Sequence, residues 1–444
     1  MRLRKLSPVQ LLALGFAIII FVGACLLALP FASRDGEALR FYDALFTAVS
    51  ATCVTGLVVC DTATQFSFFG QLVIICLIQI GGLGFMAVAT LGMMILRKRI
   101  GLKSRSRLVE AEGALQLGGV VRMTRRILLG TAFVEGLGTL LLCVRFLPRF
   151  GTWKGLWYAL FHAVSAFCNA GFDLFGAVEP YSSLCTLEGD PYVLCVLSAL
   201  ILTGGIGFLV WDDLAENKLH ARKWRLHTKL ALSAAAVLTL AGMALFLVTE
   251  REGVLQEMGA GKRLAAVLFL SVSPRTAGFN AVDLRALSPA GVTLTILLMV
   301  VGASPGSTGG GMKTTTVAAV VLSLGALAAS RRDATVFGRR IEEHTVYRAF
   351  RSAMLYLLLA AFGCMAILVA QPLDVTDTFF EVFSALGTVG LTLGATQELN
   401  GFSRAVVMLL MYAGRVGSLS MMTAVALRRR TSALRCPEER ILIG

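Results

Sequence analysis

Charged side chains are scarce in this sequence: Asp, Glu, Lys and Arg make up 15% of its 444 residues, whereas 56% of the residues are hydrophobic. Such a composition excludes a soluble chain, and several apolar stretches reach the ~20 residues that a helix needs to cross a bilayer. The four histidines do not cluster, and no C-x-x-C pair or Cys/His spacing suggests zinc. Because a membrane enzyme would need a cluster of His, Asp, Glu or Cys within its spans, we expect no enzymatic activity.

One short apolar stretch occurs four times. Residues 46–56 read F-T-A-V-S-A-T-C-V-T-G, and residues 161–171 and 380–390 keep its Phe, Ser and Gly at the same spacing. Residues 268–278 form a looser copy with the Phe shifted by one position. The four terminal glycines, at positions 56, 171, 278 and 390, follow one another at steps of 115, 107 and 112 residues. A period this regular indicates four repeats.

Each copy is too short to cross a membrane, yet it lies between two stretches that are long enough. We therefore expect an all-α polytopic membrane protein with eight spans and four re-entrant half-helices around a pseudo-fourfold central pore, as in a K⁺ channel. The predicted spans are 9–31 and 66–96, 124–147 and 192–210, 226–248 and 289–330, and 346–370 and 402–427. The half-helices are 39–51, 155–166, 264–273 and 375–386. The predicted divisions are repeat 1 (1–100), a cytoplasmic linker (101–123), repeat 2 (124–217), repeat 3 with a broken second span (218–330), a second cytoplasmic linker (331–345), repeat 4 (346–430) and a cytoplasmic tail (431–444).

Basic residues indicate the orientation. The segments before, between and after the repeats hold 28 of the 41 Lys and Arg residues. Cytoplasmic segments carry such an excess, so both termini are predicted to be cytoplasmic and the half-helices to enter from outside. The apolar run at the N-terminus continues to Phe31 without a convincing cleavage site, which predicts a retained span in the inner, cytoplasmic membrane. The net charge of +14 gives no reason to expect a nucleic-acid partner, because the basic residues are clustered between apolar spans that need a lipid bilayer.

The ends of the four copies are candidates for a cation filter. Glycine tolerates positive φ and lets a backbone turn its carbonyl groups toward a ligand. Half-helices entering from outside would also point their partially negative C-terminal ends at the loops, and a ring of carbonyl groups can hold a desolvated K⁺ ion. The predicted K⁺-binding residues are Cys53, Val54, Thr55 and Gly56; Cys168, Asn169, Ala170 and Gly171; Arg275, Thr276, Ala277 and Gly278; and Gly387, Thr388, Val389 and Gly390.

A glycine-rich segment at 306–315, G-S-T-G-G-G-M-K-T-T, could be mistaken for a phosphate-binding loop. Met312 separates Gly311 from Lys313, and the segment interrupts an apolar span, so we expect this chain to bind no nucleotide. Irregular backbone at bilayer depth is tolerated when it lines water or is buried in protein. A gate directly inside the filter and a helix-packing seam are both compatible with this pattern. The predicted gate residues are Gly306, Ser307, Thr308, Gly309, Gly310, Gly311, Lys313 and Arg415.

Three Gly-x-x-Gly segments, 81–84, 204–207 and 414–417, occupy equivalent places in the return spans of repeats 1, 2 and 4. We expect close helix packing around the pore at these segments. The last one carries Arg415, and a charge within a span is expensive and usually functional. About a dozen residues separate Arg415 from the basic tail, which favours a pore-facing position over snorkelling to the cytoplasmic edge.

Together these residues resemble the Ktr/Trk/HKT superfamily of potassium transporters, and most of all its KtrB type of membrane subunit. The matching motifs are V-T-G-L at 54–57, N-A-G-F-D at 169–173, R-T-A-G-F-N at 275–280, G-T-V-G-L at 387–391, S-T-G-G-G-M-K-T at 307–314 and the lone Arg415. The resemblance implies potassium uptake through a K⁺-conducting pore, a gate at the glycine loop, and a homodimer on a cytosolic KtrA-type nucleotide-binding regulatory ring. A chain that begins with the first repeat favours KtrB over TrkH-type relatives, which carry extra N-terminal spans.

Two alternatives stay open at this point, namely an ion-coupled symporter and a less selective Na⁺/K⁺ transporter of the same superfamily. A solute site would be expected on broken helices of an inverted repeat, whereas these four repeats share one orientation. Four filter glycines accompany K⁺ preference in this superfamily, but Cys53, Cys168 and Pro274 depart from its usual loops and leave the fine selectivity open. The sequence does not distinguish passive, Na⁺-stimulated and proton-coupled transport.

Overall fold

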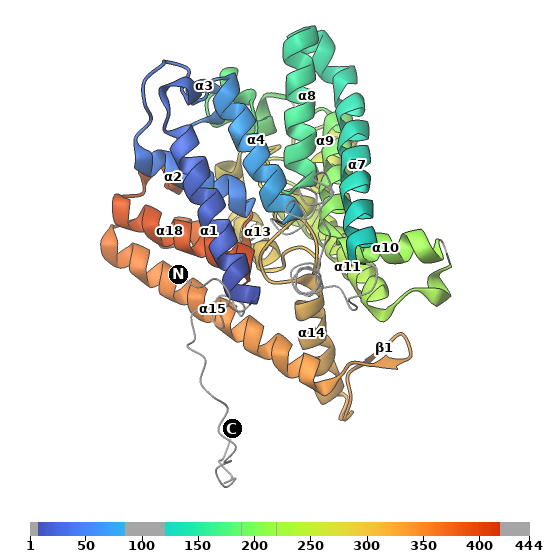
Figure 1. Ribbon diagram of the computed structural model, residues 1–444. Coiled ribbons are helices and arrows are strands. Elements are labelled where there is room, and N and C mark those ends of the chain that lie inside the picture. The colour runs from blue at the N-terminus through green and yellow to red at the C-terminus, as the bar shows by residue number, and fades with distance from the viewer. Residues whose placement is uncertain (1–7, 85–119, 188, 219, 418–444) are drawn as a thin grey trace.

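Long apolar helices dominate the structure, a computed structural model that describes residues 8–84, 120–187, 189–218 and 220–417 (Figure 1). Four helices in this part of the chain are long and apolar enough to cross a membrane: α1 (Pro8–Leu27), α7 (Val120–Phe150), α11 (Leu226–Thr249) and α15 (Glu343–Ala370). Each is the first helix of one predicted repeat. Large apolar side chains such as Phe133, Val248 and Phe362 are more than 70% exposed on them. Such surfaces suit lipid contact, which makes the chain a multi-pass membrane protein.

A shorter helix follows each long one: α2 (Phe41–Cys53), α8 (Thr152–Phe167), α12 (Ala260–Val272) and α16 (Val375–Gly387). These four match the predicted half-helices within a few residues, and their C-terminal parts are buried. Asp374 begins α16 because its side chain accepts a hydrogen bond from the Thr376 N–H. Val54 and Thr388 adopt the left-handed conformation and so end α2 and α16.

The return helices are α4 (Phe68–Leu83), α9 (Pro191–Gly205), α13 (Pro289–Val300) and α18 (Gly401–Val416). Each begins at a polar N-cap: Ser67, Asp190, Ser288 or Asn400. The inner parts of the predicted spans 66–96 and 402–427 lie outside the described residues, as do most of the linker 101–123 and the tail 431–444. The break predicted in the third repeat is present, since α13 ends at Val300 and α14 (Thr314–Ala328) begins after residues 301–313.

The return span predicted as one segment, 192–210, is divided by a sharp bend near its C-terminal end. Helix α9 ends at Gly205, and α10 (Phe208–Asn217) leaves it at an angle of 90°. Gly207 lies between them with φ of 97°. Residues other than glycine rarely adopt this backbone conformation, and it interrupts a right-handed helix. The second repeat therefore turns sharply at the glycine segment instead of continuing inward.

Small elements complete the fold. They are α3 (Thr62–Gln65) and α17 (Ala395–Glu398), the 3₁₀ turns η2 (Pro30–Ala32), η3 (Phe175–Ala177), η4 (Ser183–Leu187), η5 (Ala221–Lys223) and η6 (Leu284–Ala286), and strands β1 (Thr335–Val336) and β2 (Arg339–Arg340). The two strands pair antiparallel, with Thr335 opposite Arg340, so the expected all-α fold carries one short hairpin.

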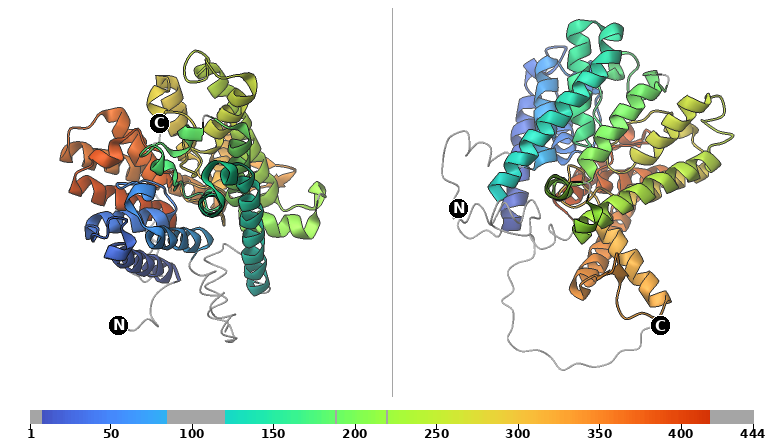
Figure 2. Two further views of the ribbon diagram at one scale, coloured as in Figure 1. Left: turned by 90° about the horizontal axis from the view of Figure 1, so that it is seen from above. Right: turned by 90° about the vertical axis from the view of Figure 1, so that its right-hand side faces the viewer.

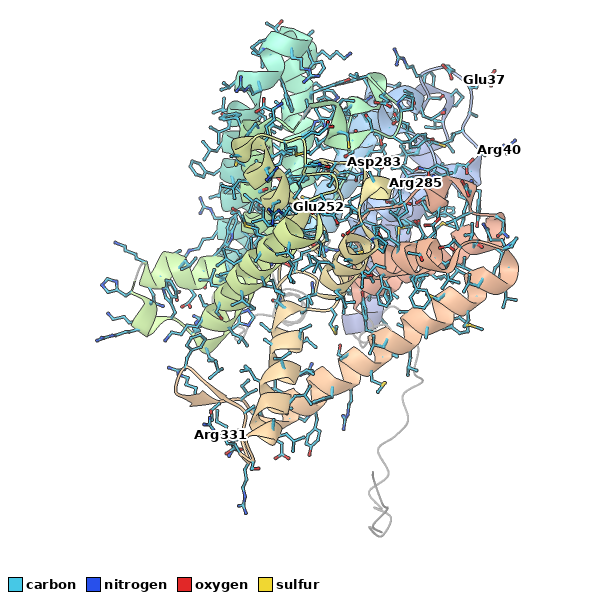
Figure 3. All side chains as sticks on the ribbon, turned by 180° about the vertical axis from the view of Figure 1, so that it is seen from behind. Glu37, Arg40, Glu252, Asp283, Arg285 and Arg331 are labelled. Carbon is cyan, nitrogen blue, oxygen red and sulfur yellow. The ribbon has the colours of Figure 1, made fainter. Side chains whose placement is uncertain are left out.

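The four repeats surround a common centre, in which α2, α8, α12 and α16 are packed against the return helices (Figures 1 and 2). Helix α14, the hairpin and the beginning of α15 project from one end of the molecule (Figure 1). Figure 3 shows Arg331 at this end, and Glu37 and Asp283 toward the opposite end. The projecting segment thus carries basic residues such as Arg331 at one end of the protein, whereas the loops toward the opposite end carry both acidic and basic residues, such as Glu37 and Arg40 (Figure 3).

Candidate ion pathway

The four terminal glycines lie side by side in a closed ring. Each glycine is packed against a backbone carbonyl oxygen of the loop in the next repeat. The pairs are Gly56 with Ala170, Gly171 with Ala277, Gly278 with Val389, and Gly390 with Thr55. A Cβ atom at Gly56 would be 2.6 Å from the Ala170 oxygen, and Cβ atoms at Gly278 and Gly390 would overlap their neighbours. The ring therefore closes only because these positions have no side chain.

The backbone of each loop alternates between two conformations. Two residues before the glycine, a residue with a side chain takes positive φ: Val54 (57°), Asn169 (58°), Thr276 (76°) and Thr388 (51°). The glycines also have positive φ, from 69° to 98°, whereas the residue between does not. Such alternation turns successive carbonyl groups toward the same side. Positive φ is unusual for a β-branched residue such as Val54. It persists only where the surrounding structure holds it, and such residues cluster at functional sites.

A serine of each half-helix supports its loop. The serine carbonyl oxygen accepts a hydrogen bond from the residue before the glycine, with distances of 2.8 Å for Thr55 to Ser50, Ala170 to Ser165 and Val389 to Ser384, and 2.9 Å for Ala277 to Ser273. The hydroxyl oxygens of Ser50 and Ser384 accept from the N–H of Gly56 and Gly390, both at 3.1 Å. The hydroxyls of Ser165 and Ser273 donate to the carbonyls of Phe172 and Phe279. The loop N–H groups thus face the helix, and within the described part of the chain they leave the carbonyl groups of the ring free of hydrogen bonds.

Residues that follow the four glycines in the sequence join successive repeats by hydrogen bonds. The contacts are Tyr181 N–H to Asp61, Leu184 N–H to the Asn280 carbonyl, the Arg285 guanidinium to the Leu393 carbonyl, and the Gln397 amide to the Val58 carbonyl. They join repeat 1 to 2, 2 to 3, 3 to 4 and 4 to 1. The loops therefore keep their mutual spacing through a second closed set of contacts.

The residue three before each glycine contributes its backbone alone to the loop. Cys53 and Gly387 are the last residues of α2 and α16. The side chain of Arg275 points away from the ring, because it donates to the Ala235 carbonyl at 3.3 Å and to the Thr239 hydroxyl at 2.8 Å, both on α11. Of the sixteen predicted residues, twelve thus form the loops themselves, and Cys53, Cys168, Arg275 and Gly387 lie at their entrance from the half-helix.

The glycine-rich segment lies against the helix-end side of the ring. The Thr308 hydroxyl donates to the Phe167 carbonyl at 3.0 Å, and the Gly310 N–H donates to the Thr388 hydroxyl at 3.1 Å. Gly309 is so close to the Thr276 hydroxyl that a Cβ atom would overlap it. The segment therefore contacts the end of α8 and the third and fourth loops at once.

Two cations hold this segment. Lys313 donates to the carbonyl oxygen of Gly309 at 2.7 Å, within its own loop. The guanidinium of Arg415 donates to the carbonyl of Thr308 and to those of Gly81 and Gly82 at the end of α4. Arg415 thus joins the glycine-rich segment to the first and fourth repeats, and carbonyl groups surround its charge.

The Gly-x-x-Gly segments allow this close approach, as their pattern predicts. The first glycine of each segment is packed against a backbone carbonyl at the end of the half-helix in the same repeat. The pairs are Gly81 with Thr52, Gly204 with Phe167, and Gly414 with Leu386. The last glycine, Gly84, Gly207 or Gly417, ends its helix with positive φ. The return helices therefore contact the half-helices backbone to backbone.

Sequence reasoning did not assign a role to the four serines, although their fixed spacing was a signal. Ser50, Ser165 and Ser384 each precede their glycine by six residues, and Ser273 precedes its glycine by five. His162 also supports a loop, since its Nε2 accepts from the Leu174 N–H at 3.3 Å while its Nδ1 lies 2.7 Å from the Tyr158 carbonyl. Among the described residues, no group of three or more His, Cys, Asp or Glu could hold a metal ion.

This architecture and comparisons with known proteins identify the class as multi-pass membrane transport proteins. A family model described as TrkH, cation transport protein, matches residues 17–432, so the chain belongs to that family of ion transporters, which are not enzymes. It is 43% identical to potassium/sodium uptake protein NtpJ of Enterococcus hirae over 99% of this chain and 98% of that protein. It is 38% identical to Ktr system potassium uptake protein B of Bacillus subtilis over 99% and 97%, respectively. These findings confirm the family resemblance that the motifs indicated.

A solved structure supports the fold. The crystal structure of the potassium transporter TrkH from Vibrio parahaemolyticus superposes with a TM-score of 0.73 and covers 96% of this chain and 86% of that one. The two sequences are 18% identical, so this likeness concerns the arrangement of helices.

Proposed function

We propose that this protein mediates potassium uptake across the cytoplasmic membrane through the ring formed by its four loops. The observation that carries the proposal is the closed glycine-to-carbonyl ring with an alternating backbone. Carbonyl oxygens in such a ring replace the hydration shell of a K⁺ ion. Four half-helices end at the ring, and their partially negative C-terminal ends favour a cation and disfavour an anion.

In the same proposal the glycine-rich segment at 306–313 is the gate. Its contacts with the end of α8 and with the third and fourth loops support this role, because a segment in that position obstructs the route on the helix-end side of the ring. Arg415 holds it through the Thr308 carbonyl. Opening then requires Arg415 to release either Thr308 or the carbonyls of Gly81 and Gly82.

The proposed topology has eight spans in four repeats, with both termini in the cytoplasm. The arginines of the projecting segment, Arg331, Arg332, Arg339 and Arg340, support this orientation. The half-helices then enter from outside and the gate lies toward the cytoplasm.

We propose further that two copies assemble and that a KtrA-type cytosolic nucleotide-binding ring regulates transport. A relative named protein B of a Ktr system, and the projecting basic segment around Arg331, support this assembly. The mass of the purified protein in detergent, and its flux with and without such a subunit, test it. A monomer whose flux is indifferent to the subunit contradicts it.

A second candidate function is less selective transport of both Na⁺ and K⁺. The relative that is 43% identical carries both ions in its name, which favours this possibility for a chain so similar. The two candidates differ in the effect of Na⁺, which should reduce K⁺ flux by competition only if the ring carries both ions.

The decisive experiment replaces Gly56 by Ser. Its Cβ would lie 2.6 Å from the Ala170 oxygen, so the ring must widen and its preference for K⁺ over Na⁺ should fall. Competitive K⁺ and Na⁺ flux in vesicles measures this preference. Gly36→Ser is a matched control, because Gly36 has φ of 73° but no neighbour within 4 Å of a built Cβ. An unchanged K⁺/Na⁺ flux ratio in Gly56→Ser would show that Gly56 does not take part in ion selection.

A further inference from the structure

Helix α7 carries a carboxyl group inside the membrane-spanning part of the fold. Glu135 lies near the middle of α7 (Val120–Phe150) and its side chain is buried. Among the described residues no Lys, Arg or His pairs with it, since every ion pair found there involves another acid. Ionisable groups at this depth are costly, and they are generally retained for a function.

Glu135 belongs to a closed network of three side chains. The Gln79 amide, on α4, donates to one carboxyl oxygen of Glu135 at 3.1 Å. The thiol of Cys168 lies 3.5 Å from the Gln79 amide oxygen and 3.9 Å from the other carboxyl oxygen of Glu135. The Cys168 thiol also fills the space left by the missing side chain of Gly82, whose built Cβ would be 2.7 Å away. The network thus fixes Cys168 between the first and second repeats.

Cys168 occupies a position that the long helix supports in other repeats too. It lies three residues before Gly171, as Arg275 lies before Gly278 and Gly387 before Gly390. Thr239 on α11 accepts a hydrogen bond from Arg275, and the Tyr356 hydroxyl on α15 would be 3.5 Å from a Cβ at Gly387. The first helix of each of these repeats therefore contacts the residue at which its loop begins. In the second repeat a carboxyl group makes this contact.

We propose that Glu135 is a positioning residue that holds the start of the second loop through Cys168 and so sets the preference for K⁺ over Na⁺. The inference rests on the proposed function of the ring. Asn169, which follows Cys168, contacts the Thr276 hydroxyl of the third loop at 3.1 Å. A shift of Cys168 is therefore transmitted to two loops of the ring, whose carbonyl spacing discriminates between the ions.

The test compares two substitutions of Glu135. Glu135→Gln keeps an oxygen that accepts from Gln79, whereas Glu135→Leu removes both contacts that Glu135 makes and leaves only the one between Cys168 and Gln79. We expect Glu135→Leu to lower the K⁺/Na⁺ flux ratio by about fivefold, the effect of losing one or two buried hydrogen bonds, while Glu135→Gln stays within about twofold of the unmodified protein. Flux is measured per folded transporter in vesicles, so that lower expression does not count as lower selectivity.

Gln79→Leu should also lower the ratio, and the double variant Gln79→Leu with Glu135→Leu should lose less than the sum of the two single losses, because both residues belong to one network. Thr131→Val is the matched control on α7: Thr131 is buried, and its hydroxyl has no hydrogen-bond partner in the part of the chain that the structure describes. The control should keep the original ratio.

Three outcomes overturn the inference: an unchanged ratio in Glu135→Leu, an equal loss in Glu135→Gln, or additive losses in the double variant. If Glu135→Leu does not fold, the ratio in Gln79→Leu decides alone. Failure of the proposed function is distinguishable, because the unmodified protein would then carry no K⁺ at all.

Discussion

At the scale of single residues, small side chains and unusual backbone angles make the ring. The loops combine glycines that touch carbonyl groups with residues such as Val54 and Thr388 that are held in the left-handed conformation. Holding a β-branched residue there costs on the order of 1–3 kcal/mol. The hydrogen bonds from the loop N–H groups to the serines of the half-helices offset part of this cost.

A first prediction concerns Ser384. Replacing it by Ala leaves the buried N–H of Gly390 without its acceptor, at a cost of about 1–3 kcal/mol. We expect a lower melting temperature and a lower K⁺/Na⁺ flux ratio. Thermal unfolding in detergent and competitive flux in vesicles measure the two effects.

Ser198→Ala is the control for this variant. Ser198 is also buried, but its hydroxyl has no hydrogen-bond partner within the described residues. Its replacement should change neither quantity. If the two serine variants behave alike, the Ser384 hydroxyl does not support the fourth loop.

At the scale of elements, hydrophobic pattern and glycine spacing predict much of what the structure contains. The half-helices are found within a few residues of their predicted bounds because their length, burial and terminal glycines are local features. The 90° turn between α9 and α10 was missed, although Gly207 stands at the turn. The same Gly-x-x-Gly pattern serves both close packing and a helix end, and the local sequence does not separate these two uses.

The second prediction concerns the gate segment and its anchor. Arg415→Ala removes the contacts with Thr308, Gly81 and Gly82, so the segment loses its link to the first and fourth repeats. We expect K⁺ flux per folded transporter to rise several-fold with an unchanged K⁺/Na⁺ ratio. Deleting residues 309–311 should act in the same direction, because it shortens the obstruction.

Arg404→Ala provides the comparison on the same helix. In the described part of the chain Arg404 pairs with Asp43 at 2.8 Å and donates to the Gln397 carbonyl, not to residues 306–313, so its loss should not raise flux. A fall of flux in well-folded Arg415→Ala protein would contradict the gate and favour a packing seam, in which the segment only joins helices.

At the scale of the whole molecule, closure of the ring depends on contacts that no single repeat contains. The repeats are visible in the sequence at their regular spacing, and so is the residue set of each loop. The sequence does not reveal that Arg285 reaches Leu393, that Gln397 reaches Val58, or that Glu135 lies behind Cys168, because these pairs are far apart in the chain. Such long-range contacts are decided by packing of the whole fold, where propensity and periodicity carry no information.

The last prediction concerns orientation in the membrane. Gly36 directly precedes Glu37, and Gly338 lies between β1 and β2 in the projecting hairpin, so the two belong to opposite ends of the molecule (Figures 1 and 3). Both have positive φ, 73° and 71°, and neither would bring a Cβ atom within 4 Å of a neighbour. Cysteine at either position therefore introduces the same backbone strain and a free thiol. A membrane-impermeant maleimide added to intact cells should label Gly36→Cys. Gly338→Cys should react only after permeabilisation. Its hairpin belongs to the basic segment that the positive-inside bias assigns to the cytoplasm. The unmodified protein gives the background from its native cysteines. Labelling of Gly338→Cys in intact cells would contradict the proposed topology. The gate segment would then face the outside, and the half-helices would enter from the cytoplasm.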